Sequence, residues 1–193
     1  MAKAPIMPEV DRQTFAKWLS VCWLTSVLSI SGLLWTMFYP DRHPVVFAFS
    51  ISWIIALVVA TLTREALLKG DPNRFRFAGW EHEGRVYRQL GIGVFCRVLK
   101  RTPLGWLNPY LKLNPDHFGF ERLLREMRYA ERAHMIGGVI TLTISVGYGL
   151  TGHLQIGACL LVVTIVVHIY PVMLQRWNRG RILRLIRRRD RRL

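Results

Sequence analysis

The chain has 193 residues, 51% of them hydrophobic, and carries a formal net charge of +15 at pH 7. A single soluble core would hardly satisfy both properties, so we expect the apolar and the basic residues to be segregated along the sequence. The three cysteines have no metal-type spacing and imply no disulfide framework.

Charge-free runs cover residues 18–39, 44–63, 135–152 and 154–175. Each is close to the roughly 17–25 residues that a bilayer requires of a helix. The first run is too long for the apolar part of a secretory signal and ends in Phe38-Tyr39-Pro40, without small cleavage-site residues. The sequence therefore predicts an all-α integral membrane protein with four transmembrane helices and a cytoplasmic interfacial helical region between the second and the third.

The basic residues predict the orientation of these helices. Of the 27 Lys and Arg residues, 26 lie before the first run, between the second and third, or after the fourth. Because positively charged short loops stay in the cytoplasm, we expect both termini there. The predicted organisation is a cytoplasmic segment (1–17), a transmembrane hairpin (18–63), a cytoplasmic or interfacial region (64–134), a second hairpin (135–175) and a basic cytoplasmic tail (176–193).

The region 64–134 alternates aromatic with basic residues, which is typical of segments lying at the level of the lipid head groups. It either anchors a linker or forms a platform that holds an amphiphilic substrate. Residues 80–90 predict a short helix that Gly91 and Gly93 interrupt, and residues 120–133 predict a helix that runs directly into the third span. The basic tail directly follows a span, so anionic lipid head groups are favoured over nucleic acid as its partner.

The third and fourth spans carry different packing signals. A ridge of small residues recurs every four positions in the third span and should let another helix approach closely; it consists of Gly137, Thr141, Ser145 and Gly149. The fourth span places polar residues and a proline on one face, namely His168, Pro171, Gln175, Asn178 and Arg179.

Pro171 has no N–H to donate to the carbonyl of Val167, which predicts a defect in the fourth helix. His168 lies one turn earlier on the same face. An ionisable residue inside a membrane is a functional candidate because its burial is costly. The alternative is an interhelical hydrogen bond that only fixes the packing.

Glu126, Glu131 and His134 stand at the entry to the third span. Glu131 and His134 are neighbours on a helix, so the carboxylate is placed to orient an imidazole that acts as a base. The alternative is a structural set of ion pairs, since Arg128 is also one turn from Glu131.

No metal site is expected. The string Trp80-Glu81-His82-Glu83-Gly84 suggests metal ligands, but the chain has only six histidines, and His43 and His153 fall in the opposite turns. A multi-histidine di-iron desaturase or hydroxylase is therefore disfavoured. Phosphate-binding glycine loops, nucleophile elbows and zinc spacings are also missing from the sequence.

Three strings together resemble the glycosyl-4,4'-diaponeurosporenoate acyltransferase family, which consists of small bacterial membrane proteins. The matching residues are Trp80-Glu81, Gly84, Tyr87 and Leu90-Gly91-Ile92; then Glu126, Ala130-Glu131 and His134; then Tyr170-Pro171, Gln175-Arg176-Trp177-Asn178-Arg179 and Arg181. Their order and spacing agree over residues 75–182.

The resemblance implies transfer of a fatty acyl group to a sugar hydroxyl of a carotenoid glycoside in the bacterial cytoplasmic membrane. The donor would be an acyl thioester on coenzyme A or acyl carrier protein, with no bound cofactor. On this reading His134, oriented by Glu131, is the base. Glu126 completes the catalytic group, and Glu81 binds the sugar.

Arg176, Arg179 and Arg181 would neutralise the donor's phosphates or the oxyanion. The remaining predicted substrate-binding residues are Trp80, Gly84, Tyr87, His168, Tyr170, Gln175 and Asn178. The expected partners are membrane lipids and the glycoside or a similar amphiphile.

A different class of function fits the same features. Small-residue ridges and exposed aromatics also suit a non-catalytic subunit that packs within a larger membrane complex. A lipid or pigment carrier is a third reading, in which the same amphiphile is bound without being modified.

Overall fold

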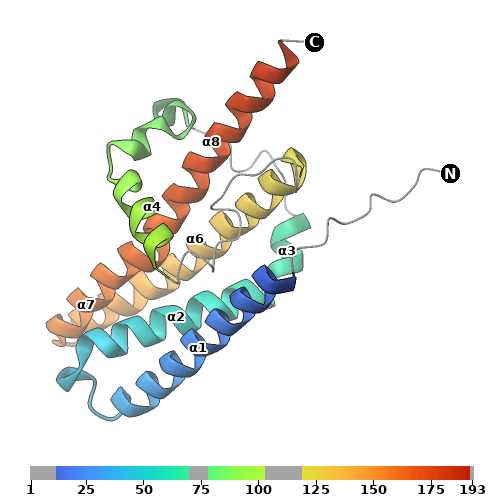
Figure 1. Ribbon diagram of the computed structural model, residues 1–193. Helices are drawn as coiled ribbons and strands as arrows, with labels where there is room; N and C mark the ends of the chain where they lie inside the picture. Colours follow the sequence, from blue (N-terminus) through green and yellow to red (C-terminus); the bar gives the residue numbers. More distant parts are fainter. Residues whose placement is uncertain (1–11, 70–77, 103–118, 192–193) are drawn as a thin grey trace.

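The computed structural model describes residues 12–69, 78–102 and 119–191, and within these ranges the chain contains helices and no strand (Figure 1). The α-helices are α1 (Arg12–Thr36), α2 (Pro44–Leu62), α3 (Arg64–Lys69), α4 (Ile92–Arg101), α6 (Phe120–Leu150), α7 (Leu154–Thr164) and α8 (Tyr170–Asp190). Two segments are 3-10 helices, η1 (Pro40–Arg42) and η3 (Gly79–Arg88), and η6 (Ile165–Ile169) is a π-helix. The predicted all-α class is confirmed.

Three helical segments of the described chain are long and apolar enough to cross a membrane: Pro44–Leu62, Leu123–Leu150 and Leu154–Arg188. The apolar part of α1 covers the shorter stretch Ser20–Thr36. The second, third and fourth predicted spans thus have matching helices, and the first stays a prediction. Large side chains such as Trp23, Leu62 and Val139 are exposed along these helices, which favours a lipid surrounding.

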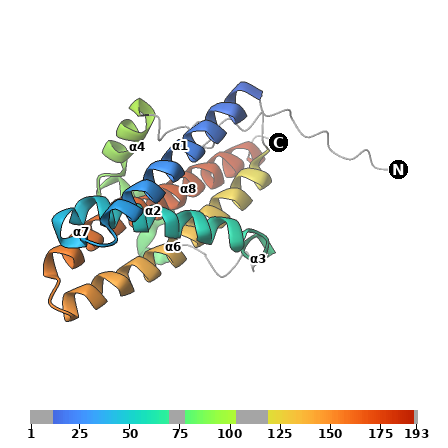
Figure 2. The ribbon, with the colours of Figure 1, turned by 90° about the horizontal axis from the view of Figure 1, so that it is seen from below.

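Two helical hairpins form the apolar half of the molecule. α1 pairs with α2, α6 pairs with α7, and α2 packs against both α6 and α7 (Figures 1 and 2). Phe47 and Ala48 of α2 meet Ile156 and Leu160 of α7 in a buried cluster. The turns of the two hairpins lie at the same end, where Nδ1 of His153 is 3.2 Å from Oδ1 of Asp41.

The small-residue ridge of α6 is the surface on which α7 and η6 pack. A Cβ added to Gly137 would lie 2.6 Å from Cε1 of His168. Thr164 donates to the hydroxyl of Thr141 at 3.0 Å, and Ser145 donates to the carbonyl of Gly157 at 2.7 Å. The predicted close approach of another helix is confirmed.

α7, η6 and α8 follow one another without a break, and the irregular segment lies just before Pro171. The N–H of Tyr170 donates to the carbonyl of Ile165, five residues earlier, which is the π pattern. The predicted helix defect near Pro171 is therefore present and takes the form of a π-helix. Such segments are often found at functional sites.

The segment 80–90 differs from the prediction in detail. Residues 79–88 form the 3-10 helix η3, and Gly91, with a φ of +80°, lies between it and α4. Gly93 lies inside α4 and interrupts nothing. Much of the aromatic and basic region, including Phe75, Phe77 and Trp106, lies outside the described residues.

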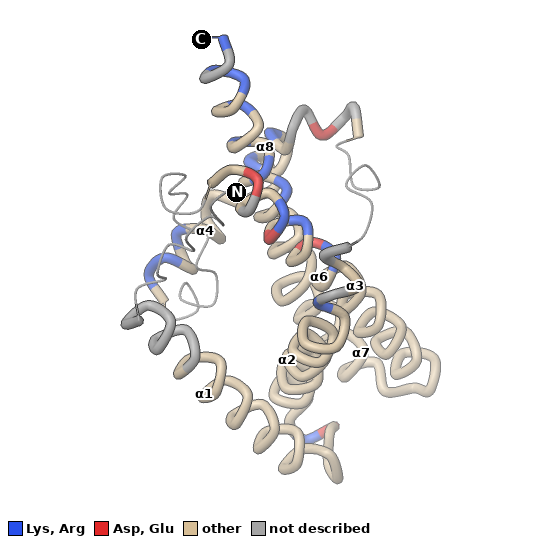
Figure 3. The backbone as a smooth tube through the Cα atoms, turned by 90° about the vertical axis from the view of Figure 1, so that its right-hand side faces the viewer, with Lys and Arg blue, Asp and Glu red and all other residues tan. Residues whose placement is uncertain are grey.

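Charge is segregated in space as the sequence predicts. Lys and Arg gather along α8, α4 and the first turns of α6, whereas α2, α7 and the coloured part of α1 carry none; a charged pair lies in the turn between α1 and α2 (Figure 3). This arrangement places the polar part of the molecule at one end of the apolar hairpins.

Candidate active site

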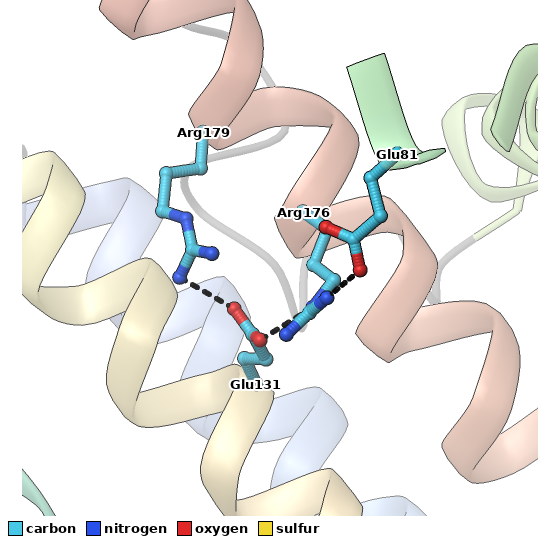
Figure 4. A network of polar contacts seen from close by, with 4 residues as sticks. All are labelled: Glu81, Glu131, Arg176 and Arg179. Atoms are coloured by element: carbon cyan, nitrogen blue, oxygen red, sulfur yellow. Dashed lines mark hydrogen bonds and ion pairs between the residues drawn. The ribbon is translucent and has the colours of Figure 1, made fainter. Parts of the chain in front are cut away.

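Four charged residues from three elements meet where α6 and α8 cross the edge of η3 (Figure 4). Nε of Arg176 donates to Oε1 of Glu131 at 2.6 Å, and Nη1 of Arg179 donates to Oε2 of the same carboxylate at 2.7 Å. Nη1 of Arg176 also bonds to Oε1 of Glu81. Two carboxylates and two guanidinium groups therefore form one network.

The network is buried. Glu131 is fully buried, Glu81 is 2% exposed and Arg179 is 4% exposed. Removing charges from water costs several kcal/mol per ion, and close, well-aligned partners are required to offset that cost. The balance of two negative and two positive charges meets this requirement and ties η3, α6 and α8 together.

Gly84 and Tyr87 fit η3 onto α8. Gly84 has a φ of +84°, and a Cβ there would lie 2.9 Å from the carbonyl oxygen of Arg176. The buried Tyr87 hydroxyl makes hydrogen-bond contact with both Arg176 and Glu81, and burial raises the pKa of this phenol above its usual value. The phenol therefore stays protonated at neutral pH and acts as a neutral member of the network.

Two imidazoles lie close together on the membrane side of the network. The ring centroids of His134 on α6 and His168 in η6 are 5.8 Å apart in an edge-to-face arrangement. The ring of His134 faces the backbone of Val167, the residue whose carbonyl receives no N–H from Pro171. A side chain of α6 thus lies beside the carbonyl that Pro171 leaves without its usual partner.

Both histidines carry buried nitrogens with unmet hydrogen-bonding capacity. Nδ1 of His134 has no partner among the described residues. His168 is fully buried and faces the backbone of Ser52 and His134 without a well-formed bond to either. A buried polar group without a partner costs about 1–3 kcal/mol, which marks this place as one where a substrate group can bind.

The family model described as glycosyl-4,4'-diaponeurosporenoate acyltransferase matches residues 71–188. The chain belongs to this acyltransferase family. The matched range contains the whole charge network and both histidines, and it confirms the resemblance of the three strings. No curated protein and no solved structure matches the chain.

The predicted pairing of Glu131 with His134 is not what this acyltransferase-family chain shows. Both oxygens of Glu131 are held by Arg176 and Arg179. Charge-assisted bonds to guanidinium groups are stronger than a bond to a neutral imidazole, so the carboxylate of Glu131 binds the two arginines and not His134. The alternative set of ion pairs is the one observed, with arginines of α8 as the partners.

Glu126 lies apart from the histidines. Its carboxylate is 3.3 Å from Nη2 of Arg64, and the guanidinium of Arg64 covers the ring of Tyr129. This pair connects the start of α3 to α6.

The other predicted residues of the acyltransferase-family strings surround the network. The hydroxyl of Tyr170 donates to the carbonyl of Leu90 at 3.3 Å, and Arg181 stacks on Trp177 at 4.8 Å. Gln175 and Asn178 are buried on the polar face of α8, and Oε1 of Gln175 and Nδ2 of Asn178 have no partner in the described part of the chain. The side chain of Trp80 lies outside the described residues.

Ser52 and Cys96 complete the description of the site. Ser52 of α2 is fully buried, and its backbone faces His168; this contact was not predicted, because a backbone contact leaves no signal in the residue type. Burial raises the pKa of the Cys96 thiol, which disfavours it as a nucleophile. The described residues contain no cluster of side chains suited to a metal ion.

Proposed function

We propose that the chain is a membrane acyltransferase that moves a fatty acyl group from a thioester donor to a sugar hydroxyl of a carotenoid glycoside or a related lipid. The family match over residues 71–188 carries this proposal, because it covers the charge network and the two buried histidines. A thioester already holds an activated acyl group, so no bound cofactor is needed.

The reaction forms a bond between the acyl carbonyl carbon and the sugar oxygen and breaks the bond from that carbon to sulfur. The sugar hydroxyl gives its proton to a base, and the departing thiolate takes up a proton. Negative charge develops on the carbonyl oxygen during the attack and requires a nearby donor or cation.

His134 is the proposed general base. Its ring faces the backbone of Val167, and its Nδ1, which has no partner among the described residues, can accept a proton from a bound hydroxyl. His168, with its ring centroid 5.8 Å away, is proposed to bind the same substrate group. Glu131 then acts as a positioning residue through the two arginines.

The sugar is proposed to bind between η3 and α8. Oε2 of Glu81, Oε1 of Gln175 and Nδ2 of Asn178 are buried polar atoms without partners among the described residues. Carboxylate and amide groups of this kind form hydrogen bonds with hydroxyls. Arg176 and Arg179 already neutralise Glu131, so we assign them to holding the site together.

The apolar hairpins are proposed to cross the bacterial cytoplasmic membrane, with both termini in the cytoplasm. A lipid-soluble acceptor would then reach the histidines from the bilayer, and a water-soluble donor would arrive from the charged end. Segregation of charge at that end supports this assignment.

The experiment combines the purified chain in lipid discs with a radiolabelled acyl thioester and a carotenoid glucoside. We expect a labelled, acylated glucoside. His134→Ala should lower the rate about 100-fold or more, the usual effect of losing a general base. His153→Ala, in the turn at the opposite end, is the matched control and should keep the activity.

Two results would contradict the proposal. Full activity of His134→Ala would remove the assigned base. Absence of any acylated product, together with stoichiometric co-purification of other membrane proteins, would favour the non-catalytic subunit instead.

A further inference from the structure

A pocket at the far end of α8 is lined by arginines alone, as far as the described residues go. Arg85 comes from η3, Arg184, Arg187 and Arg188 come from α8, and Arg191 directly follows the last residue of α8. The pocket holds about 220 Å³, which is below the roughly 300–1,000 Å³ of sites that enclose a whole drug-sized ligand. It is large enough for one or two anionic groups.

The pocket follows from the same docking that builds the candidate active site. Positions 184, 187, 188 and 191 fall on one face of a helix. The close fit of Gly84 on the backbone of α8, with the bond from Arg176 to Glu81, brings η3 and therefore Arg85 to this face. The polar network and the arginine pocket thus share one interface between η3 and α8.

Five arginine side chains line this one pocket, so positive charge is concentrated there and attracts an anion. The planar guanidinium group matches the geometry of phosphate oxygens and binds them through two parallel bonds. Phosphate is therefore the ligand chemistry that this lining favours.

The phosphate could belong to a lipid head group or to a soluble molecule, and the position of the pocket distinguishes these two sources. Arg184 and Arg191 lie nine and sixteen residues beyond Gln175, where the charge-free run ends. At about 1.5 Å per residue these arginines are about 14 and 24 Å farther along the helix. The head-group layer on each side of a bilayer is only about 5–8 Å thick, so lipid head groups would lie nearer to Gln175 than the pocket does.

We propose that this pocket binds the phosphate groups of the acyl donor, a nucleotide-bearing thioester of the coenzyme A type. The identity of the ligand as the donor rests on the proposed acyltransferase function. Arg184 lies sixteen residues beyond His168, about 24 Å along the helix. A donor of this class carries its thioester on a long flexible arm, which extends back along α8 toward the histidines.

The first test measures binding of coenzyme A to the full chain in neutral phosphatidylcholine discs. The variant carries Arg187→Gln, Arg188→Gln and Arg191→Gln. The matched control carries Arg97→Gln, Lys100→Gln and Arg101→Gln, which removes the same charge from exposed positions of α4. We expect at least tenfold weaker binding in the pocket variant and unchanged binding in the control. Equal binding by the wild type and the pocket variant would overturn the proposal.

The second test uses an acyl pantetheine, a thioester donor without the nucleotide or its phosphates. The pocket variant should show a raised KM with acyl coenzyme A and wild-type kinetics with the acyl pantetheine. A loss with both donors would overturn the proposal. A defect that appears only in discs containing anionic lipid would also overturn the proposal, because the ligand would then be a head group. The proposal would be overturned as well if the wild type transferred acyl groups from acyl carrier protein and not from acyl coenzyme A.

Failure of the two proposals can be told apart. If coenzyme A binds in a manner that depends on Arg187, Arg188 and Arg191 while no acylated product forms, the pocket stands and the acyltransferase reaction fails. If transfer occurs and the pocket variant binds and reacts like the wild type, the reaction stands and the pocket assignment fails.

Discussion

Glu131 is the residue on which the charged site depends. Its two oxygens each accept a bond from a different arginine, and its side chain is fully buried. A carboxylate in this position stabilises the site because it neutralises Arg176 and Arg179, which would otherwise be buried cations of like charge. We therefore propose that its part in the reaction is indirect, through the placement of α8 relative to α6.

Glu131→Gln keeps the volume of the side chain and removes its charge. We expect a loss of about 3–5 kcal/mol in unfolding free energy, because the buried carboxylate that Arg176 and Arg179 share is lost and Glu81 alone remains as a charged partner within the network. Reversible unfolding in mixtures of mild detergent and SDS, followed by tryptophan fluorescence, measures it.

Glu126→Gln is the control for this change. It breaks the pair with Arg64, whose side chain is 53% exposed, and should cost less than about 1 kcal/mol. Equal effects of the two substitutions would show that burial of Glu131 adds nothing.

The sequence predicted this site in part. Helical spacing placed Glu131 and His134 on adjacent positions of one turn, and that neighbourhood is real. The partner of Glu131 could not be predicted, because Arg176 and Arg179 come from another helix 45 and 48 residues later. Local spacing gives the candidates on one helix, whereas competition among charges from distant elements decides the bonds.

At the scale of elements, the contact between η3 and α8 builds both the network and the arginine pocket. Charge-free runs and the small-residue ridge were enough to predict the helices and the packing of α6, since both depend on regular spacing. The π form of η6 and the 3-10 form of η3 were not predicted, because Pro171 and Gly91 signal a break without specifying its geometry.

Gly84→Ala tests the contact between η3 and α8. The new Cβ would meet the backbone of Arg176 at 2.9 Å and that of Trp177 at 3.0 Å, in a conformation that favours glycine. Neither backbone atom can rotate away, so η3 should separate from α8. We expect at least a tenfold loss of acyl transfer and of coenzyme A binding, measured with the same assays.

Gly93→Ala is the matched glycine control. Nothing lies within 4 Å of a Cβ at this position of α4. The substitution should be neutral or should stabilise the protein by at most about 1 kcal/mol. Wild-type activity of Gly84→Ala would show that the contact between η3 and α8 does not shape the site.

At the scale of the whole molecule, the segregation of charge implies one working side. The two turns joined by Asp41 and His153 lie at one end, and the charged network lies at the other (Figures 1 and 3). In the described part of the chain Lys and Arg are concentrated at the network end, and we propose that this end faces the cytoplasm, because positively charged short loops stay there.

Cysteine labelling in intact and opened bacterial cells measures this orientation. In a background without the three native cysteines, a membrane-impermeant maleimide should label His153→Cys in intact cells. It should label Arg101→Cys only after the membrane is opened. Labelling of both positions in intact cells would contradict two cytoplasmic termini.

We propose that this chain acylates a membrane-soluble glycoside. Mass spectrometry of the pigments and lipids of cells with and without the protein tests this proposal most directly, because no substrate has to be assumed. We expect cells lacking the protein to lose an acylated glycoside and to accumulate the same molecule without its acyl chain. Identical pigment and lipid profiles in the two strains would contradict it.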